Sequence, residues 1–231
     1  MKARPAFCFQ ALGLLLLLAT AGCVSFRGGE LVTGKPYKPT NIYGSEHPLP
    51  LDVRRVAVLP LNINRSDLEA GQTLLQPVLE EELSRTKRFE VVPVSPEQLA
   101  AWTGRKSLWT AEVLPKDLLV ILQEKLGCDA VLFAELTHFQ AYPPLAVGWN
   151  LKLVEVRSGQ LLWAADEVFD AGHPAVAAGA RLYHSSHSLV SGPLADSRLI
   201  LLSPTAFGRY SAQTLFAALP EPTSGLKFST H

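Results

Sequence analysis

The chain has 231 residues, and its 21 lysines and arginines balance its 21 aspartates and glutamates, so its formal net charge is zero. This balance excludes a non-specific nucleic-acid binder, which needs a basic surface. The three cysteines are Cys8, Cys23 and Cys128. Because the first two belong to the amino-terminal segment, Cys128 stands alone in the remainder, and the sequence predicts no internal disulfide framework.

The amino-terminal segment has the three-part layout of a secretory signal peptide. Lys2 and Arg4 give a basic start, residues 12–19 form a short apolar core, and small residues directly precede Cys23. The apolar run is too short to span a bilayer, which takes roughly 20 apolar residues. We therefore predict a signal peptide over residues 1–22.

A cysteine at this cleavage point resembles the lipobox of bacterial lipoproteins, although Thr20 stands where those proteins prefer leucine. The resemblance implies that Cys23 is acylated, which anchors a soluble domain at a membrane. Val24 follows the cysteine in place of aspartate, and the resemblance then favours the periplasmic side of the outer membrane. The alternative is a plain secreted protein that is cut near Ala21 and keeps an unmodified cysteine.

Three further regions follow the signal peptide. Residues 23–51 are rich in glycine and proline and are predicted to form a lipidated, flexible tether. Residues 52–220 are predicted to form one domain, and residues 221–231 a loose tail. Three side chains of the tether are apolar enough to dock on the domain or on a neighbouring subunit: Tyr37, Ile42 and Tyr43.

Strand and helix patterns alternate along the domain. Apolar runs and alternation predict strands over residues 54–61, 89–93, 129–136, 149–156 and 160–169. Helical spacing predicts helices over residues 68–87, 95–102, 114–126, 171–190 and 204–219. The predicted fold class is α/β, with a mixed β-sheet and packed helices in a single domain. The sheet residues expected in the core are Val56, Val58, Val131, Phe133, Leu153 and Trp163.

Local signals set the expected ends and faces of the helices. Ser66 and Asp67 offer an N-cap for the helix over residues 68–87, in which Pro77 indicates a kink or a later start. Gly127 is expected to end the helix before it. Phe216 is expected to point away from the apolar face of the last helix.

Four of these segments carry a family likeness: residues 55–61, 89–93, 127–136 and 151–163. Their order resembles that of the periplasmic lipoprotein superfamily that includes CsgG, the amino-terminal domain of TolB, LpoB and PelC. The resemblance covers residues 54–170 and implies an α/β sandwich without an active site, whose members act by binding partners or by forming rings. Members share the scaffold and not the task, so the resemblance names no partner.

Two histidines are the main candidates for chemistry. His184 and His187 are three residues apart, which places them on one face of a helix, where they can bind a metal with Asp196 as a distant third ligand. We prefer a solvated or partner-facing pair, because two ligands alone are weak grounds for a metal site. Ser185 and His184 are adjacent and point apart on a helix, and Cys128 is expected to be buried and inert. The sequence therefore predicts no catalytic residue and no cofactor.

Trp102 and Trp109 flank a polar loop, and exposed tryptophan is a frequent anchor of interfaces. The alternative is that the rings fold back over a small core. We predict a non-enzymatic binding or assembly module of a cell-envelope complex, with Trp102, Trp109, His184 and His187 as partner contacts. The expected partner is an envelope protein or a second copy of the chain. The alternatives are a ring-forming subunit of an export or secretion channel and a metal-dependent or serine hydrolase.

Overall fold

The computed structural model describes residues 37–44, 48–112, 115, 117–187 and 196–222. Within them lies a seven-stranded sheet with the strand order β1-β7-β6-β5-β2-β4, and β3 pairs with β5 beside this path. The strands are β1 (Ile42–Tyr43), β2 (Arg55–Val58), β3 (Asn62–Ile63), β4 (Glu90–Pro93), β5 (Ala130–Gln140), β6 (Ala146–Glu155) and β7 (Leu161–Asp170). β2 runs parallel to β4 and β5, whereas β5, β6 and β7 pair antiparallel. The mixed sheet that the sequence predicts is therefore confirmed.

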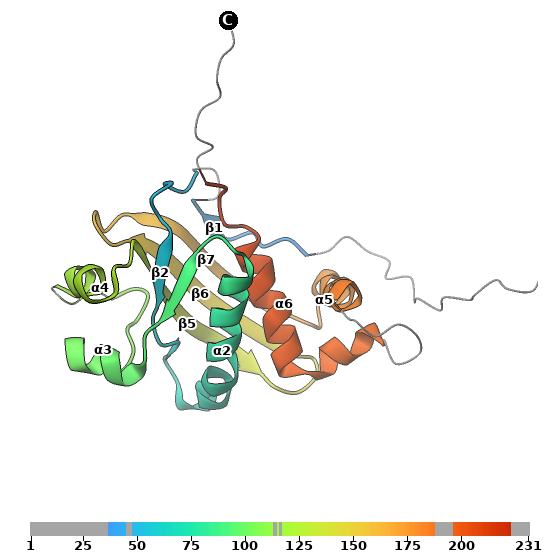
Figure 1. Cartoon of the computed structure of the whole chain (residues 1–231). Helices are drawn as coiled ribbons and strands as arrows, with labels where there is room; N and C mark the ends of the chain where they lie inside the picture. Colours follow the sequence, from blue (N-terminus) through green and yellow to red (C-terminus); the bar gives the residue numbers. More distant parts are fainter. Residues whose placement is uncertain (1–36, 45–47, 113–114, 116, 188–195, 223–231) are drawn as a thin grey trace, which may run out of the picture.

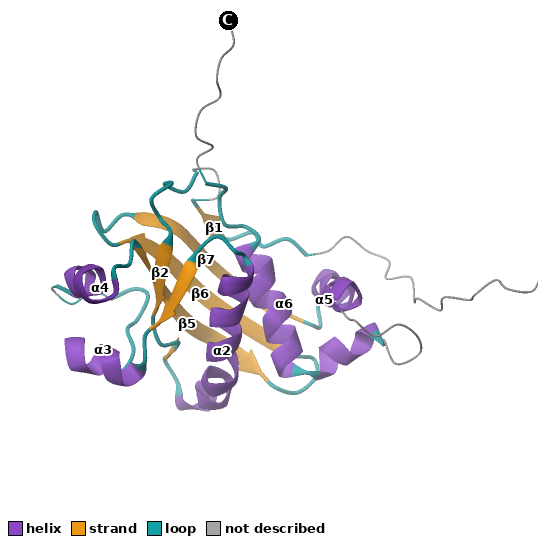
Figure 2. Ribbon diagram, in the orientation of Figure 1, coloured by secondary structure: helices purple, strands orange, loops and turns teal. Residues whose placement is uncertain are grey.

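Helices cover both faces of this sheet. They are α2 (Glu69–Arg85), α3 (Pro96–Thr103), α4 (Leu118–Leu126), α5 (Pro174–His187) and α6 (Pro204–Phe216), with the 3-10 helices η1 (Ser66–Leu68) and η2 (Ser197–Leu202). Figure 1 shows α2 and α6 side by side across the sheet, with α3 and α4 at the opposite end of the molecule from α5. Figure 2 shows the same layers by element type. The two helical layers follow from the alternation of side chains along β2. Val56 and Val58 face the main core, whereas Ala57 faces a smaller cluster that includes residues of α3 and α4.

The predicted core and hairpin are confirmed. The six sheet residues that we expected in the core are at most 3% exposed. The turn between β6 and β7 contains Gly159 at a φ of +70°, which a residue without a side chain adopts readily. The main elements also follow one another in the predicted order, and the fold class is α/β.

Part of the predicted tether packs on the domain. Strand β1 pairs antiparallel with β7, and Ile42 lies opposite Ala165. The Tyr37 hydroxyl donates a 2.8 Å hydrogen bond to Glu167, and its ring meets the Phe169 ring edge-on at a centroid distance of 5.4 Å. These contacts are the docking on the chain's own domain that the sequence left open.

The start of α2 differs from the prediction. Ser66 and Asp67 belong to η1, and Leu68 stands at the N-cap position without a capping side chain, so the predicted N-cap is wrong. A later start at Pro77 is also wrong, because this residue lies inside the helix. Pro77 has no N–H for the carbonyl of Thr73, but both residues are exposed, so water can satisfy that carbonyl.

Three other helices differ at their ends. Helix α4 begins at Leu118 rather than at residue 114, although Gly127 ends it as predicted. Helix α5 begins at Pro174 rather than at residue 171, and the predicted residues 188–190 lie outside the described part of the chain. Helix α6 ends at Phe216, and the expected outward direction of this ring is wrong. The Phe216 ring is 2% exposed and packs at 6.3 Å from Trp163, because α6 buries more than one of its faces.

Candidate interaction sites

The two candidate tryptophans lie in different environments. Helix α3 begins at a capping box, in which Ser95 and Gln98 satisfy each other's backbone N–H groups, and it ends at Gly104. Trp102 in its last turn is half-buried and packs on the smaller cluster. Trp109 in the following loop is 39% exposed. The folding back that the sequence left open therefore describes Trp102, whereas the ring of Trp109 meets solvent.

Both chain neighbours of Trp109 are buried. Leu108 is 1% exposed, and Thr110 is 9% exposed. The Thr110 hydroxyl donates a 3.1 Å hydrogen bond to the carboxylate of Glu135, and Lys152 Nζ donates a 2.7 Å bond to the Thr110 carbonyl. Glu135 and Lys152 come from β5 and β6 on one face of the sheet, so the sheet holds the chain directly beside the exposed ring.

Two further contacts hold the same loop, residues 105–112, which we name the Trp109 loop. Arg105 Nη1 lies 2.6 Å from the carboxylate of Glu112, and the Ser107 hydroxyl donates a 2.7 Å hydrogen bond to Asn62 Oδ1 of β3. Asn62 is itself 2% exposed. A restrained loop has little conformational freedom left to lose when it binds, which favours affinity.

Sequence reasoning did not single out Glu135 and Lys152, which hold this loop. Each is a charged residue in a strand that is otherwise apolar or alternating, and a buried charge requires a partner. That signal is enough to predict a buried polar contact at Glu135. It does not name Thr110, because this partner lies 25 residues earlier in the chain.

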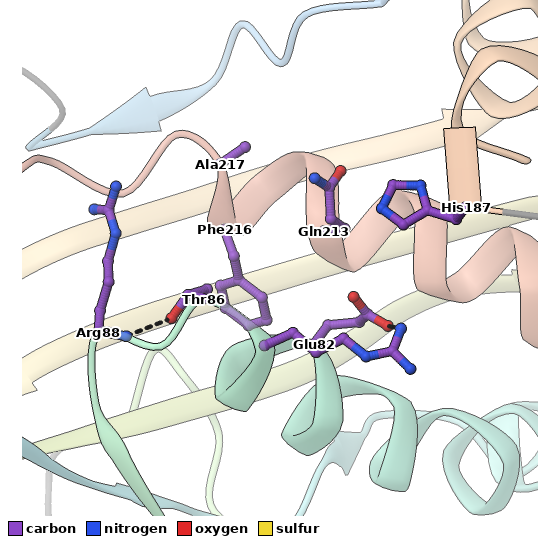
Figure 3. A pocket seen from close by; sticks show the side chains of 8 residues that line it. Glu82, Thr86, Arg88, His187, Gln213, Phe216 and Ala217 are labelled. Atoms are coloured by element: carbon purple, nitrogen blue, oxygen red, sulfur yellow. Dashed lines mark hydrogen bonds and ion pairs between the residues drawn. The ribbon is translucent and has the colours of Figure 1, made fainter. Parts of the chain in front are cut away.

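The histidine pair lies at the end of α5. His187 stacks on Tyr183 at a ring-centroid distance of 4.2 Å, and its Nδ1 lies 2.9 Å from the Tyr183 carbonyl oxygen. His187 lines a cavity of about 270 Å³ together with Glu82 of α2 and Gln213 of α6. Figure 3 shows these three side chains. His184 is half-buried on the same helix and does not line this cavity.

The acidic group of this cavity belongs to an ion-pair network. The Glu82 side chain is 1% exposed, and its carboxylate lies 2.8 Å from Arg85 and 3.2 Å from Arg209. Glu81 lies 2.6 Å from each of the same two arginines, and the hydrogen bond from Arg209 holds the pKa of Glu81 below its usual range. The network ties α2 to α6, which explains a carboxylate inside the apolar face of α2.

Arg88, another polar residue that lines the cavity, is also hydrogen-bonded within the domain. Arg88 donates hydrogen bonds of 3.0 Å to the carbonyl of Leu219 and 2.8 Å to that of Pro220. These bonds fix the chain that follows α6 against the end of α2. The cavity is therefore a junction of helix ends whose charged groups already have partners.

The other candidates for chemistry have local partners. Within the described residues, no group of three or more histidine, cysteine, aspartate or glutamate side chains is placed to hold a metal ion. Asp196 caps η2 and lies 3.0 Å from the guanidinium of Arg198. The Ser185 hydroxyl donates a 2.9 Å bond to the Arg181 carbonyl. Cys128 is 2% exposed, and burial raises the pKa of its thiol.

The predicted lipidation site, Cys23, lies outside the described residues, as does the whole of residues 1–22. Across the described part of the chain, no helix is both long enough and apolar enough to cross a membrane. Attachment through Cys23 therefore stays a prediction.

Comparisons with known proteins find similarity to solved structures. No family model matches the chain, and no curated protein matches it. A PelC dodecamer from Paraburkholderia phytofirmans has a TM-score of 0.42 and 13% identity, over 72% of this chain and 87% of that one. A lipoprotein from Neisseria meningitidis has a TM-score of 0.39 and 18% identity, over 59% of this chain and 99% of that one.

TolB from Acinetobacter baumannii has a TM-score of 0.28 and 16% identity, over 64% of this chain and 32% of that one. PelC and TolB are two of the proteins that the sequence resemblance names.

Proposed function

We propose that this chain is a lipid-anchored, non-enzymatic binding module on the periplasmic side of the outer membrane, which captures an envelope protein through the Trp109 loop. The observation that carries the binding role is the exposure of Trp109 between two buried neighbours. The anchoring role rests on the signal-peptide layout that ends at Cys23.

The surroundings of Trp109 indicate the chemistry of the partner. An indole ring that fills a pocket is among the strongest anchors of a protein interface. The exposed Lys106 lies in the same loop, beside Arg105, which pairs with Glu112. The partner surface that fits is an apolar pocket with an acidic rim. Trp102 packs on the smaller cluster, to which Leu108 of the Trp109 loop also belongs.

Photo-crosslinking in living cells tests the proposal. A photoreactive phenylalanine analogue replaces Trp109 in the full chain, and the matched control places the same analogue at Tyr43. Tyr43 is a suitable control because it is an aromatic residue on β1 with 61% exposure. We expect one discrete adduct from position 109 and none of that mass from position 43, with mass spectrometry identifying an envelope protein.

A second variant asks whether the loop must be held. Lys152→Met removes the 2.7 Å bond to the Thr110 carbonyl without replacing Trp109 itself. We expect this variant to remain folded and to bind the crosslinked partner more weakly in a pull-down. No adduct at position 109, or the same adducts at both positions, would show that the Trp109 loop is not the interface.

His184 and His187 are proposed as a second, separate partner contact. They lie on α5, at the opposite end of the molecule from α3 and α4 (Figure 1). The double variant His184→Ala with His187→Ala tests them in the same pull-down. If it also abolishes stoichiometric zinc binding by the wild-type chain, the metal-site alternative replaces this part of the proposal.

A further inference from the structure

Large apolar side chains gather where η2 meets the turn between β5 and β6. Leu202 is 62% exposed, Leu199 is 48% exposed and Tyr142 is 81% exposed. Leu199 and Leu202 line a groove of about 680 Å³ together with Pro143 and Pro144, which directly follow Tyr142. We name Tyr142, Leu199 and Leu202 the Leu202 patch. Single exposed leucines are ordinary on protein surfaces, but a group around an apolar groove indicates an interaction site.

Two other residues of η2, Ser197 and Ile200, fix this helix to the domain. Ile200 is 1% exposed and belongs to the main core, and Ser197 is 6% exposed. The Ser197 hydroxyl accepts a 3.1 Å hydrogen bond from Arg181 Nε of α5. Because these residues are seated in the domain, Leu199 and Leu202 are displayed on a supported turn.

The chain from the predicted lipid anchor enters the domain beside this patch. The Tyr37 N–H donates a 3.2 Å bond to the Ala175 carbonyl, and the Tyr37 ring lies 6.2 Å from the ring of His173. Ala171, four residues before Ala175, lines the groove of the Leu202 patch. The first described residue of the tether and the patch are therefore joined through the short segment at the start of α5.

The number of residues between the anchor and this entry point limits where the domain can go. Residues 24–36 separate Cys23 from Tyr37. A chain of this length spans at most about 50 Å when fully extended. A tether this short raises the effective concentration of membrane surface near the patch to roughly the millimolar range, so weak contacts of the patch become occupied.

We propose that the Leu202 patch docks on the phospholipid surface of the membrane that holds the acylated Cys23, so that the domain lies against the bilayer in one orientation. This inference rests on the proposed lipid anchor. Leucine side chains suit the acyl boundary, and a tyrosine suits the headgroup level. The charged residues at the groove, Asp196 and Arg198, pair at 3.0 Å, so docking is apolar and independent of salt.

Vesicle binding by the full mature chain with Cys23→Ser tests the patch without the lipid anchor. Vesicles of phosphatidylethanolamine and phosphatidylglycerol are compared with vesicles of phosphatidylcholine alone, at low and high salt. We expect weak binding to both kinds of vesicle, with the same binding constant at low and high salt. Leu199→Ser with Leu202→Ser should lower the binding constant by about tenfold or more, since each leucine loses its apolar burial.

The matched control is Val120→Ser on α4, at the opposite end of the molecule from α5 (Figure 1). Val120 is 51% exposed, so its replacement removes exposed apolar surface away from the patch and should leave vesicle binding unchanged. Circular dichroism should show the same unfolding midpoint for all variants, because the replaced side chains are on the surface.

Three results would overturn the proposal: no vesicle binding by the parent chain, binding that high salt abolishes, or equal binding by the patch variant. A dimer in sedimentation velocity that the patch substitutions abolish, without vesicle binding by the parent chain, would assign the patch to a second copy instead. Mass spectrometry of the native chain tests acylation separately, so failure of the anchor and failure of the patch are distinguishable.

Discussion

The seating of α5 on α6 can be tested at one glycine. An added Cβ at Gly179 would lie 2.3 Å from the Tyr210 hydroxyl oxygen and 3.1 Å from its Cζ atom. The Tyr210 ring has little room to move, because it is 3% exposed and packs against Phe169 and Phe207 at centroid distances of 5.8 and 5.9 Å. Overpacking of this kind costs about 1–3 kcal/mol, whereas a helical glycine replaced by alanine gains about 0.5–1 kcal/mol. Gly179→Ala should therefore lower the free energy of unfolding by roughly 1–2 kcal/mol.

A second substitution should rescue the first. Tyr210→Phe removes the hydroxyl and leaves the ring carbon at 3.1 Å as the nearest obstacle. In that background, Gly179→Ala should be close to neutral, which gives a coupling of about 1–2 kcal/mol between the two sites. Urea unfolding of the wild type and the three variants measures the coupling, provided that the denaturant slope stays constant. Additive effects, within about 0.5 kcal/mol, would show that the Gly179 backbone does not lie against Tyr210. Helix α5, which holds η2 through the bond from Arg181 to Ser197, would then not be packed on α6 in this way.

Three other predictions concern the core, the anchor and the tyrosines. Trp163→Ala should cost about 3–5 kcal/mol in urea unfolding, because the ring is fully buried, and a much smaller loss would place Trp163 outside the core. Cys23→Ser should release the protein from washed membranes or leave the signal uncleaved, and a processed form that stays in the outer membrane would contradict acylation. Burial raises the pKa of Tyr37 and of Tyr210 from 10.0 to about 12, helped at Tyr37 by its hydrogen bond to Glu167. Unfolded tyrosine ionises near pH 10, so the unfolding free energy should stay level below about pH 10 and fall as the pH approaches about 12. A flat profile across that range would contradict the burial of these hydroxyls.

The sheet was predictable because its strands carry strong local signals. Val56 and Val58 are β-branched residues in an apolar run, and Gly159 marks the hairpin turn. The helix ends were less predictable, because tertiary contacts decide them. Ser66 is a good capping residue in isolation, but η1 takes it, and α2 begins three residues later. Pro77 is tolerated inside α2 because it lies on the solvent side, which depends on how the helix sits on the sheet.

The sequence does not determine which of the candidate contact residues are exposed. Trp102 and Trp109 flank the same polar segment, and composition does not distinguish a half-buried ring from an exposed one. The difference comes from Glu135 and Lys152, which hold Thr110 against the sheet from strands far along the chain. Leu199 and Leu202 are similar, since only the seating of Ile200 in the core decides which leucines of this apolar run remain outside. Long-range contacts of this kind have no local sequence signature.

The Trp109 loop and the Leu202 patch lie apart on the domain. The Trp109 loop follows α3, whereas the Leu202 patch and the entry of the tether lie at the end that carries α5 (Figure 1). The Thr110 hydroxyl bonds Glu135, which stands seven residues before Tyr142 along β5 and its turn, or about 20 Å of extended chain. If the patch rests on the bilayer, the sheet therefore holds the Trp109 loop off the membrane. An unoriented domain on a tether would present Trp109 to the bilayer and to the periplasm alike. Docking by the patch removes that freedom before a partner arrives, and the partner then loses less entropy on binding.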